Sequence, residues 1–366
     1  MLPDSFISGE GASHLRVVYA FAAISIAYLL FVHEWELHAG IPEIQATEDG
    51  GFKPFKTRPD LFTQGKGLVD RGLRQFPSCF QIATAQGPRI ILPNCFVDEV
   101  RNNPHFDFNN SVAKDFFAVY PGFEPFYDEC NFTMTVVRTK LTQSLNYITE
   151  DFASETVAAF QDLFNDSEEI ALKPKLLDLI ARFSTRVFIG PELCTNNEWL
   201  DITTMYTLDS FIAAHALRSW PAITRLIEMR DARRIIQPVL EDQRARNRKA
   251  REAGESTAKV ADAVGWIDDA AKGYGYDAAA AQIGLALAAN HTTTQALCSV
   301  FFDLLTHPEH IELLRDEIRS VLGEGGWKKT SLYQLRLMDS LMKESQRYHM
   351  LDFGEFHESH DYYPAI

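Results

Sequence analysis

The sequence predicts a mainly α-helical protein with a minor β-sheet. A long helix that begins after Asp277 opens the last third of the chain. Two short apolar runs, at 80–83 and 89–92, flank the turn residues Gln86-Gly87-Pro88 and indicate a small hairpin. Apolar residues recur at helical spacings of three and four in four segments of the middle of the chain: 136–148, 155–164, 173–188 and 205–218.

The composition is that of a globular protein with enough apolar residues for a large core. Of the 366 residues, 46% are hydrophobic and 23% are charged. The formal net charge of −15 argues against nucleic acid as a partner, because phosphate binding requires clustered Lys and Arg. No C-x-x-C pair occurs, so the cysteines predict neither a disulfide framework nor a zinc site, and we expect free thiols facing the cytosol: Cys79, Cys95, Cys130, Cys194 and Cys298.

The N-terminal region contains a long uncharged apolar run, at residues 17–32. A transmembrane helix needs about 20 such residues, so this run is short for a full span. We expect an N-terminal membrane anchor over residues 1–38, with its span at about 15–34, followed by a Pro- and Gly-rich linker over 39–60. A signal peptide and a buried core helix are the alternatives, although no small-residue cleavage site follows the run.

The last third of the chain has clear helix start and stop signals. Asp277 can cap a helix that runs to about Thr306. His307-Pro308 ends that helix, and Pro308 suits the first turn of a second helix, which we expect to end near Leu322, before Gly323.

Three further elements complete the prediction. Residues 244–259 are a run of charges and predict a solvated helix end and loop. Ser331 and Gln334 have the spacing of a capping box, which predicts a short helix starting there. A last helix is expected over 338–347.

The long helix carries a stripe of small side chains. Their spacing of three or four residues places them on one face of the helix, where a bulky flat group can approach the backbone. Close helix–helix packing, which also favours small residues, is the alternative. The stripe consists of Ala281, Gly284, Ala288, Thr292, Ala296 and Ser299.

The middle of the same helix contains five consecutive residues that are poor helix formers, Asn290 to Thr294. Threonine hydroxyls can bond back to the carbonyl four residues earlier, and such bonds bend a helix. A polar, bent notch in an apolar helix is typical of a functional site. The alternative is a satisfied threonine cluster that costs ~1 kcal/mol or less.

The segment Ala288-Ala289-Asn290-His291-Thr292-Thr293 resembles the oxygen-binding helix of cytochromes P450, whose motif is Ala/Gly-Gly-x-Asp/Glu-Thr-Thr/Ser. The resemblance implies that Ala288 and Ala289 border a haem and that Thr292 helps to deliver protons to oxygen. His291 stands where the family usually has an acid. A histidine with a pKa near ~6.5 can also relay protons, although a hydrogen-bonded core histidine is the alternative reading.

Two charged motifs extend the resemblance. Glu344-Ser-Gln-Arg347 matches the family's E-x-x-R, and a spacing of three places both charges on one helical face. Arg138, with Lys140 in reserve, stands where the family has a basic residue that meets a haem propionate, but the preceding tryptophan is absent; a solvated basic face is the alternative. Residues 181–200 resemble a signature of fungal members, and the resemblance extends over roughly residues 60 to 350.

The resemblance implies a cytochrome P450 fold and a haem-dependent monooxygenase that oxidises an apolar small molecule with O2. Electrons would come from NADPH–cytochrome P450 reductase, and the protein would reside in the endoplasmic reticulum membrane with its catalytic domain facing the cytosol. Oxidation of this kind is typical of fungal secondary metabolism. We therefore expect a cytochrome P450 domain over 61–347.

The family's axial cysteine is expected in a loop, F-x-x-G-x-x-x-C-x-G, that follows E-x-x-R. Residues 348–366 contain no cysteine and do not resemble the family, so they are interpreted as a divergent tail. The sequence thus predicts an incomplete, C-terminally truncated fold without a metal ligand, and an inactive chain. Two other hypotheses are a non-catalytic, membrane-anchored helical fragment that binds lipid or a partner, and a purely structural helical domain.

Overall fold

The computed structural model describes residues 37–44, 61–84, 87–128, 132–164, 170–219, 229–253 and 262–349. They form two compact units, divided after Phe106. The expected anchor span at residues 15–34 and the tail beyond His349 lie outside the described residues. Within the described ranges, no helix combines the length and apolar character that a membrane crossing requires.

The first unit combines a helix with a small sheet. Strand β2 pairs antiparallel with β3, with Phe80 opposite Ile91 and Thr84 opposite Gly87, so the predicted hairpin is confirmed. Gly87 belongs to the strand itself and not to the turn. The elements are β1 (Glu43–Ile44), which pairs parallel with β2, α2 (Leu61–Gln75), β2 (Phe80–Thr84), β3 (Gly87–Ile91), the 3₁₀ turn η1 (Asn94–Phe96) and α3 (Val97–Asn102).

The core of the first unit lies between α2 and the sheet. Phe80 and Ile82 are completely buried there and pack against Leu68 and Val69 of the helix. Gly72 makes this contact possible, because a Cβ at that position would lie 2.2 Å from the Phe80 ring.

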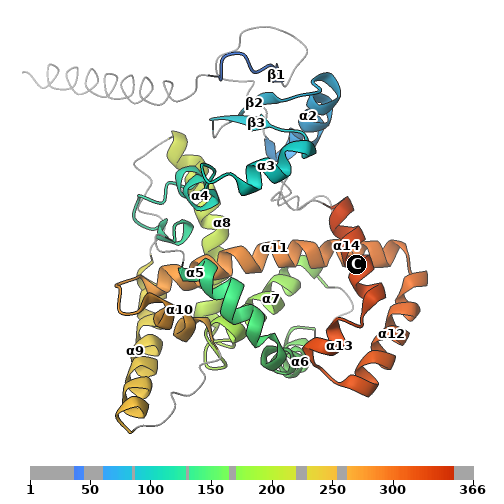
Figure 1. Ribbon diagram of the computed structural model, residues 1–366. Coiled ribbons are helices and arrows are strands. Elements are labelled where there is room, and N and C mark those ends of the chain that lie inside the picture. The colour runs from blue at the N-terminus through green and yellow to red at the C-terminus, as the bar shows by residue number, and fades with distance from the viewer. Residues whose placement is uncertain are drawn as a thin grey trace, which may run out of the picture. The chain divides into compact units, whose positions relative to one another are not determined.

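The second unit is entirely helical in its described residues, so the predicted fold class, mainly α with a minor sheet, is confirmed. Figure 1 shows α11 passing through the middle of the unit. This helix contacts α7, α8, α9, α10, α14 and the 3₁₀ turn η2. The elements are α4 (Phe108–Asp115), η2 (Glu124–Phe126), α5 (Phe132–Val136), the π-helical segment η3 (Val137–Leu141), α6 (Thr142–Leu163), α7 (Leu172–Phe188), α8 (Asn197–Ser219), α9 (Arg230–Glu252), α10 (Ala263–Ala271), α11 (Ala278–Thr306), α12 (Glu309–Gly325), α13 (Lys329–Leu332) and α14 (Arg336–Tyr348).

The long central helix follows the prediction. Asp277 caps it, and its carboxylate accepts hydrogen bonds from the amides of Ala279 (3.0 Å) and Ala280 (3.1 Å). The helix ends at Thr306, and with 29 residues it is the longest described helix. Its N-terminal turns are buried against α8 and α9, where Ile283 and Trp199 belong to one apolar cluster.

Two predicted helix boundaries in the middle of the chain differ from the structure. The helices expected at 136–148 and 155–164 are parts of one helical stretch, α5 to α6, because neither Pro nor Gly interrupts it. The helix expected from residue 205 begins earlier, at Asn197, since the side chain of Asn196 accepts a hydrogen bond from the Trp199 amide and caps it.

The charge run begins as the end of a helix, as predicted. Residues 244–252 are the last turns of α9, and the loop expected after them falls at 254–259, outside the described residues. Tertiary contacts hold this part of the helix, because Gln243 donates to Asp262 and Arg244 donates to Asp268.

Three predicted boundaries near the C-terminus are wrong. Helix α12 continues through Gly323 and ends at Gly325, because Gly326 is the residue that adopts a positive φ of 66°. Ser331 lies inside α13, so the capping box does not form. The last helix begins two residues earlier than predicted, at Arg336.

Candidate functional site

The middle of α11 presents an open face of small residues. Ala288 and Thr293 are exposed, whereas Ala289 and Thr292 are half-buried. The Thr292 hydroxyl donates to the carbonyl oxygen of Ala288 at 2.5 Å, the back-bond that the threonine cluster predicted. Helix packing therefore leaves space beside the backbone at this position.

The small residues of the stripe have different surroundings at its ends and at its centre. At Gly284 the backbone of η2 packs directly on α11, because a Cβ on Gly284 would lie 2.9 Å from the carbonyl oxygen of Pro125. At Ser299 the stripe is buried again. Close packing thus explains its ends, whereas the centre at Ala288 and Thr292 stays open.

His291 is directed toward α8. Its Nε2 lies 3.0 Å from the carbonyl oxygen of Thr204, which can only accept, so Nε2 carries the proton. Burial lowers the pKa of His291, the bond to Thr204 partly offsets that effect, and the charge of Lys173 lowers the pKa further. The ring is therefore neutral at pH 7 and half-buried, which matches the alternative of a hydrogen-bonded core histidine while leaving Nδ1 able to accept a proton.

The opposite face of the helix at this level is polar and fully buried. Asn290 has no measurable exposure and Thr294 is 1% exposed. Both amide atoms of Asn290 and the hydroxyl of Thr294 lack a hydrogen-bond partner. Buried polar atoms without a hydrogen-bond partner lower the free energy of unfolding. These three atoms lie at the same helical turn as the open face.

Glu344 and Arg347 form the predicted pair on α14. Two parallel hydrogen bonds join them, at 2.8 Å from Nε and 2.6 Å from Nη2. The side chains are 57% and 63% exposed. The Arg347 hydrogen bonds lower the pKa of Glu344, and the Glu344 carboxylate raises the pKa of Arg347. The pair lies on the outer face of α14, away from the contacts that α14 makes with α11.

Arg138 lies in the π-helical segment η3, a helix distortion that occurs frequently at functional sites. Both Arg138 and Lys140 are exposed. Among the described residues, neither pairs with a carboxylate. Beside them, Val136 is buried in one cluster with Leu285 of α11, so the basic segment is anchored next to the central helix.

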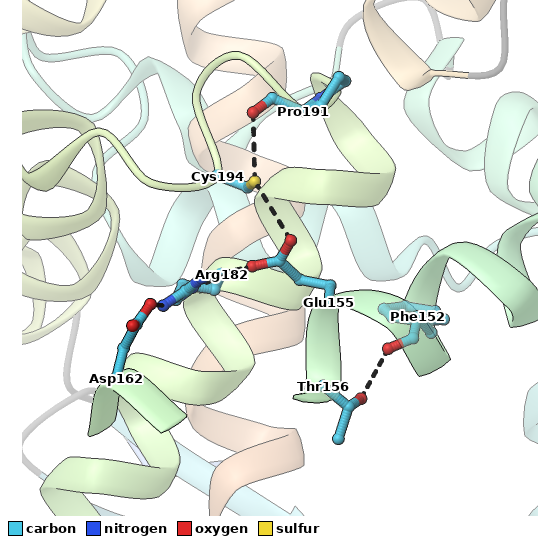
Figure 2. Close-up of polar contacts among 7 residues, drawn as sticks. All are labelled: Phe152, Glu155, Thr156, Asp162, Arg182, Pro191 and Cys194. Atoms are coloured by element: carbon cyan, nitrogen blue, oxygen red, sulfur yellow. Dashed lines mark hydrogen bonds and ion pairs between the residues drawn. The ribbon is translucent and has the colours of Figure 1, made fainter. Parts of the chain in front are cut away.

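An ionic network around the buried side chain of Arg182 was not predicted as a site. Figure 2 shows Arg182 of α7 between Glu155 and Asp162 of α6. Its guanidinium donates to Glu155 at 2.6 Å and to Asp162 at 2.8 Å, and only 8% of its side chain is exposed. Burial opposes the charge, but the two carboxylates outweigh burial and raise the pKa of Arg182.

Cys194 extends this network to the turn before α8. Its thiol lies 3.3 Å from the carbonyl oxygen of Pro191 and 3.8 Å from Glu155 (Figure 2). Burial and the nearby Glu155 raise the pKa of the thiol. Arg182 and Cys194 both belong to the segment 181–200 that resembles fungal cytochromes P450, and that resemblance was the one sequence signal for the network.

The residues near α11 fit one side of a haem. The open face at Ala288 and Thr292 suits a flat group, and Arg138 is available for a carboxylate. Cys298 of the same helix is 2% exposed and packs in one cluster with Leu176 and Leu179, and burial raises the pKa of its thiol. No cluster of three or more His, Cys, Asp or Glu residues that could hold a metal occurs in the described ranges.

Comparison with known proteins identifies the family of the chain. The family model for cytochrome P450 matches residues 132–358. The chain is 38% identical over 315 residues to the cytochrome P450 monooxygenase hepE of Aspergillus oryzae, which covers 80% of this chain and 58% of that protein.

Two further fungal relatives are similar over long stretches. Cytochrome P450 monooxygenase 1 of Gibberella fujikuroi is 40% identical over 289 residues, covering 73% of this chain and 66% of that protein. The monooxygenase calE of Penicillium decumbens is 33% identical over 371 residues, covering 94% and 71%. The chain thus spans about three fifths to seven tenths of the length of these relatives. A family match over more than half of the chain, together with relatives of this similarity, shows that the chain belongs to the cytochrome P450 family.

Proposed function

We propose that the chain belongs to a haem-dependent monooxygenase that oxidises an apolar small molecule with O2, and that α11 lies on the oxygen side of the haem. The observation that carries the proposal is the open small-residue face at the centre of α11, where Ala288 is exposed and the Thr292 hydroxyl back-bonds to its carbonyl. Ala288 and Ala289 would border the haem, which supplies the oxidation chemistry when bound.

Thr292 and His291 are the proposed proton-handling residues. The Thr292 hydroxyl holds its proton toward the Ala288 carbonyl, and rotation about one side-chain bond turns that proton toward the open face. His291 is neutral because burial lowers its pKa, so it can accept a proton at Nδ1 while Nε2 remains bonded to Thr204.

The remaining residues have binding and structural roles in this proposal. Arg138 is exposed on a helical segment that packs beside α11, and its guanidinium would pair with a haem carboxylate. Lys140 is the alternative residue for this role. Glu344 and Arg347 form a structural ion pair. The family resemblance supports electron supply by NADPH–cytochrome P450 reductase and residence at the endoplasmic reticulum membrane, with the catalytic domain on the cytosolic side.

We also propose that this 366-residue chain does not by itself bind haem through a thiolate and is inactive in that form. Cys298 and Cys194, the two described cysteines of the helical unit, are buried, and burial raises the pKa of both thiols. A sulfur that packs among other side chains in the core is not accessible to the iron of a haem.

The carbon-monoxide difference spectrum of the reduced protein tests the ligand. The purified chain, incubated with haem, is expected to give no thiolate-type band. A chimera that continues after Arg347 with the C-terminal part of the Aspergillus oryzae relative is expected to give that band. A thiolate-type band from the unmodified chain would show that one of its own cysteines binds iron.

Substitution in the same chimera tests the role of Thr292. Thr292→Ala is expected to keep the spectral band but to reduce product formed per NADPH consumed by roughly tenfold or more, because proton delivery is lost. Thr293→Ala, at the exposed neighbouring position, is the matched control and should keep normal coupling. Equal coupling in both variants would remove Thr292 from the proton path.

A further inference from the structure

Helix α14, which carries Glu344 and Arg347, is attached at both ends by carboxylates from other helices. At its C-terminal end, Nε2 of His349 lies 2.9 Å from Oδ1 of Asp303 in α11. At its N-terminal end, the carboxylate of Glu317 in α12 accepts hydrogen bonds from two backbone amides, those of Leu337 (2.7 Å) and Met338 (3.0 Å).

These attachments differ in kind from the other charge pairs of α14. Glu344 pairs with Arg347, and Asp339 pairs with Lys343, but each pair lies within the helix itself and cannot hold it against a neighbour. Among the described residues, His349–Asp303 is the ion pair that joins α14 to another helix, and Glu317 adds hydrogen bonds from two backbone amides.

The surroundings of Asp303 favour its charged form. Burial alone would raise its pKa, but the Ser345 hydroxyl and His349, with a smaller contribution from the charge of His307, outweigh burial and lower it. Ser345 lies between the two helices and is 3% exposed. The side chains of Asp303 and His349 are 28% and 38% exposed, so solvent weakens their bond without abolishing it.

We propose that Asp303 and His349 form a latch which positions α14 against α11 and, together with Glu317, sets the orientation of the helix that carries the E-x-x-R pair. Both are positioning residues. The latch joins α14 to the same helix as Thr292, 11 residues further on, or about 16 Å along the helix axis. This inference goes beyond the proposed function, and it requires no haem.

The latch predicts a defined pH dependence. Because folding lowers the pKa of Asp303 from its ordinary value of 3.8, its contribution is present above about pH 3.8 and is lost as the pH falls through the lower folded value. Nε2 of His349 lies 2.9 Å from the Asp303 carboxylate, so the ring can donate to that carboxylate while Asp303 is ionised.

Hydrogen exchange of the full 366-residue chain tests the latch. Asp303→Ala and His349→Ala are each expected to speed amide exchange in α14 by roughly fivefold while exchange in α7 stays unchanged, since the latch holds one helix only. His349→Gln places an amide nitrogen near the position of Nε2 and should restore slow exchange. Asp339→Asn, in the same helix but with a partner inside it, is the matched control and should change exchange by less than about twofold.

A double-mutant cycle decides whether the two residues act together. If they form one latch, the double variant Asp303→Ala/His349→Ala exchanges no faster than either single variant. The difference between wild type and Asp303→Ala should also shrink below about pH 3.8. Unchanged exchange in α14, equal acceleration in every helix, or additive effects of the two substitutions would each overturn the latch.

Discussion

Two residues of the same helical turn have opposite environments in this protein. Thr292 is half-buried on the open face of α11, and its hydroxyl is bonded. Asn290, two residues earlier, is completely buried with both amide atoms unpaired. An unpaired buried amide costs about 1–3 kcal/mol, so Asn290 opposes folding at the position where the helix forms its candidate site.

Replacement of Asn290 tests this cost. Asn290→Leu, which is similar in volume and has no polar atoms, is expected to raise the free energy of unfolding by about 1 kcal/mol in chemical denaturation. Asn109→Leu is the matched control and should lower it, because the Asn109 side chain bonds Asp128 twice, through its amide and its oxygen. A loss of stability in both variants would show that the Asn290 amide is satisfied in solution.

At the scale of elements, the contact between α11 and η2 depends on one glycine. The carbonyl of Pro125 occupies the space where a side chain on Gly284 would begin. Glycine in a helix interior costs about 0.5–1 kcal/mol relative to alanine, so its presence here is explained by the close approach of the two backbones.

Gly284→Ala is expected to lower the free energy of unfolding by roughly 1 kcal/mol, since the clash with a backbone oxygen exceeds the gain in helix propensity. Gly323→Ala provides the control within the same unit. Gly323 lies inside α12 with no atom near its Cβ position, so alanine should stabilise the protein by about 0.5–1 kcal/mol. Equal stabilisation by both substitutions would mean that η2 moves away from α11 at little cost.

At the scale of the whole molecule, the C-terminal helices leave much apolar surface in contact with solvent. Between Glu309 and Tyr348, large apolar side chains are more than a third exposed at seven positions: Leu313, Trp327, Leu332, Tyr333, Leu337, Met342 and Tyr348. Exposed apolar surface of this extent favours association, so we predict that the chain aggregates as its concentration rises.

Light scattering against protein concentration measures this tendency. The variant Leu313→Glu/Tyr333→Glu is expected to raise the concentration at which association begins by several-fold, because both side chains are more than half exposed. The control Val119→Glu adds negative charge at a position that is 90% exposed but lies outside α12–α14. If the control acts as strongly as the variant, net charge and not this surface governs association.

Much of the local structure and the family could be predicted from the sequence. The cap at Asp277, the break at Pro308 and the spacing of Glu344 and Arg347 act within a few residues, and the structure forms each of them as predicted. The boundaries that failed, such as the start of α14 at Arg336, depend on a distant group: the Glu317 carboxylate that accepts from the first amides of that helix.

Tertiary packing determines which face of each helix is exposed to solvent and which residues form hydrogen bonds or ion pairs with one another. The recurrence of small residues along α11 can be read from the sequence, but only packing shows that Gly284 contacts Pro125 while Ala288 remains exposed. Likewise, His291 was a candidate from its position in the motif, but the carbonyl of Thr204, 87 residues away, fixes the direction of its ring, and burial among other helices lowers its pKa. The physical reason is that spacing specifies which side chains share a face, whereas burial, pKa and partner depend on groups that only folding brings into contact.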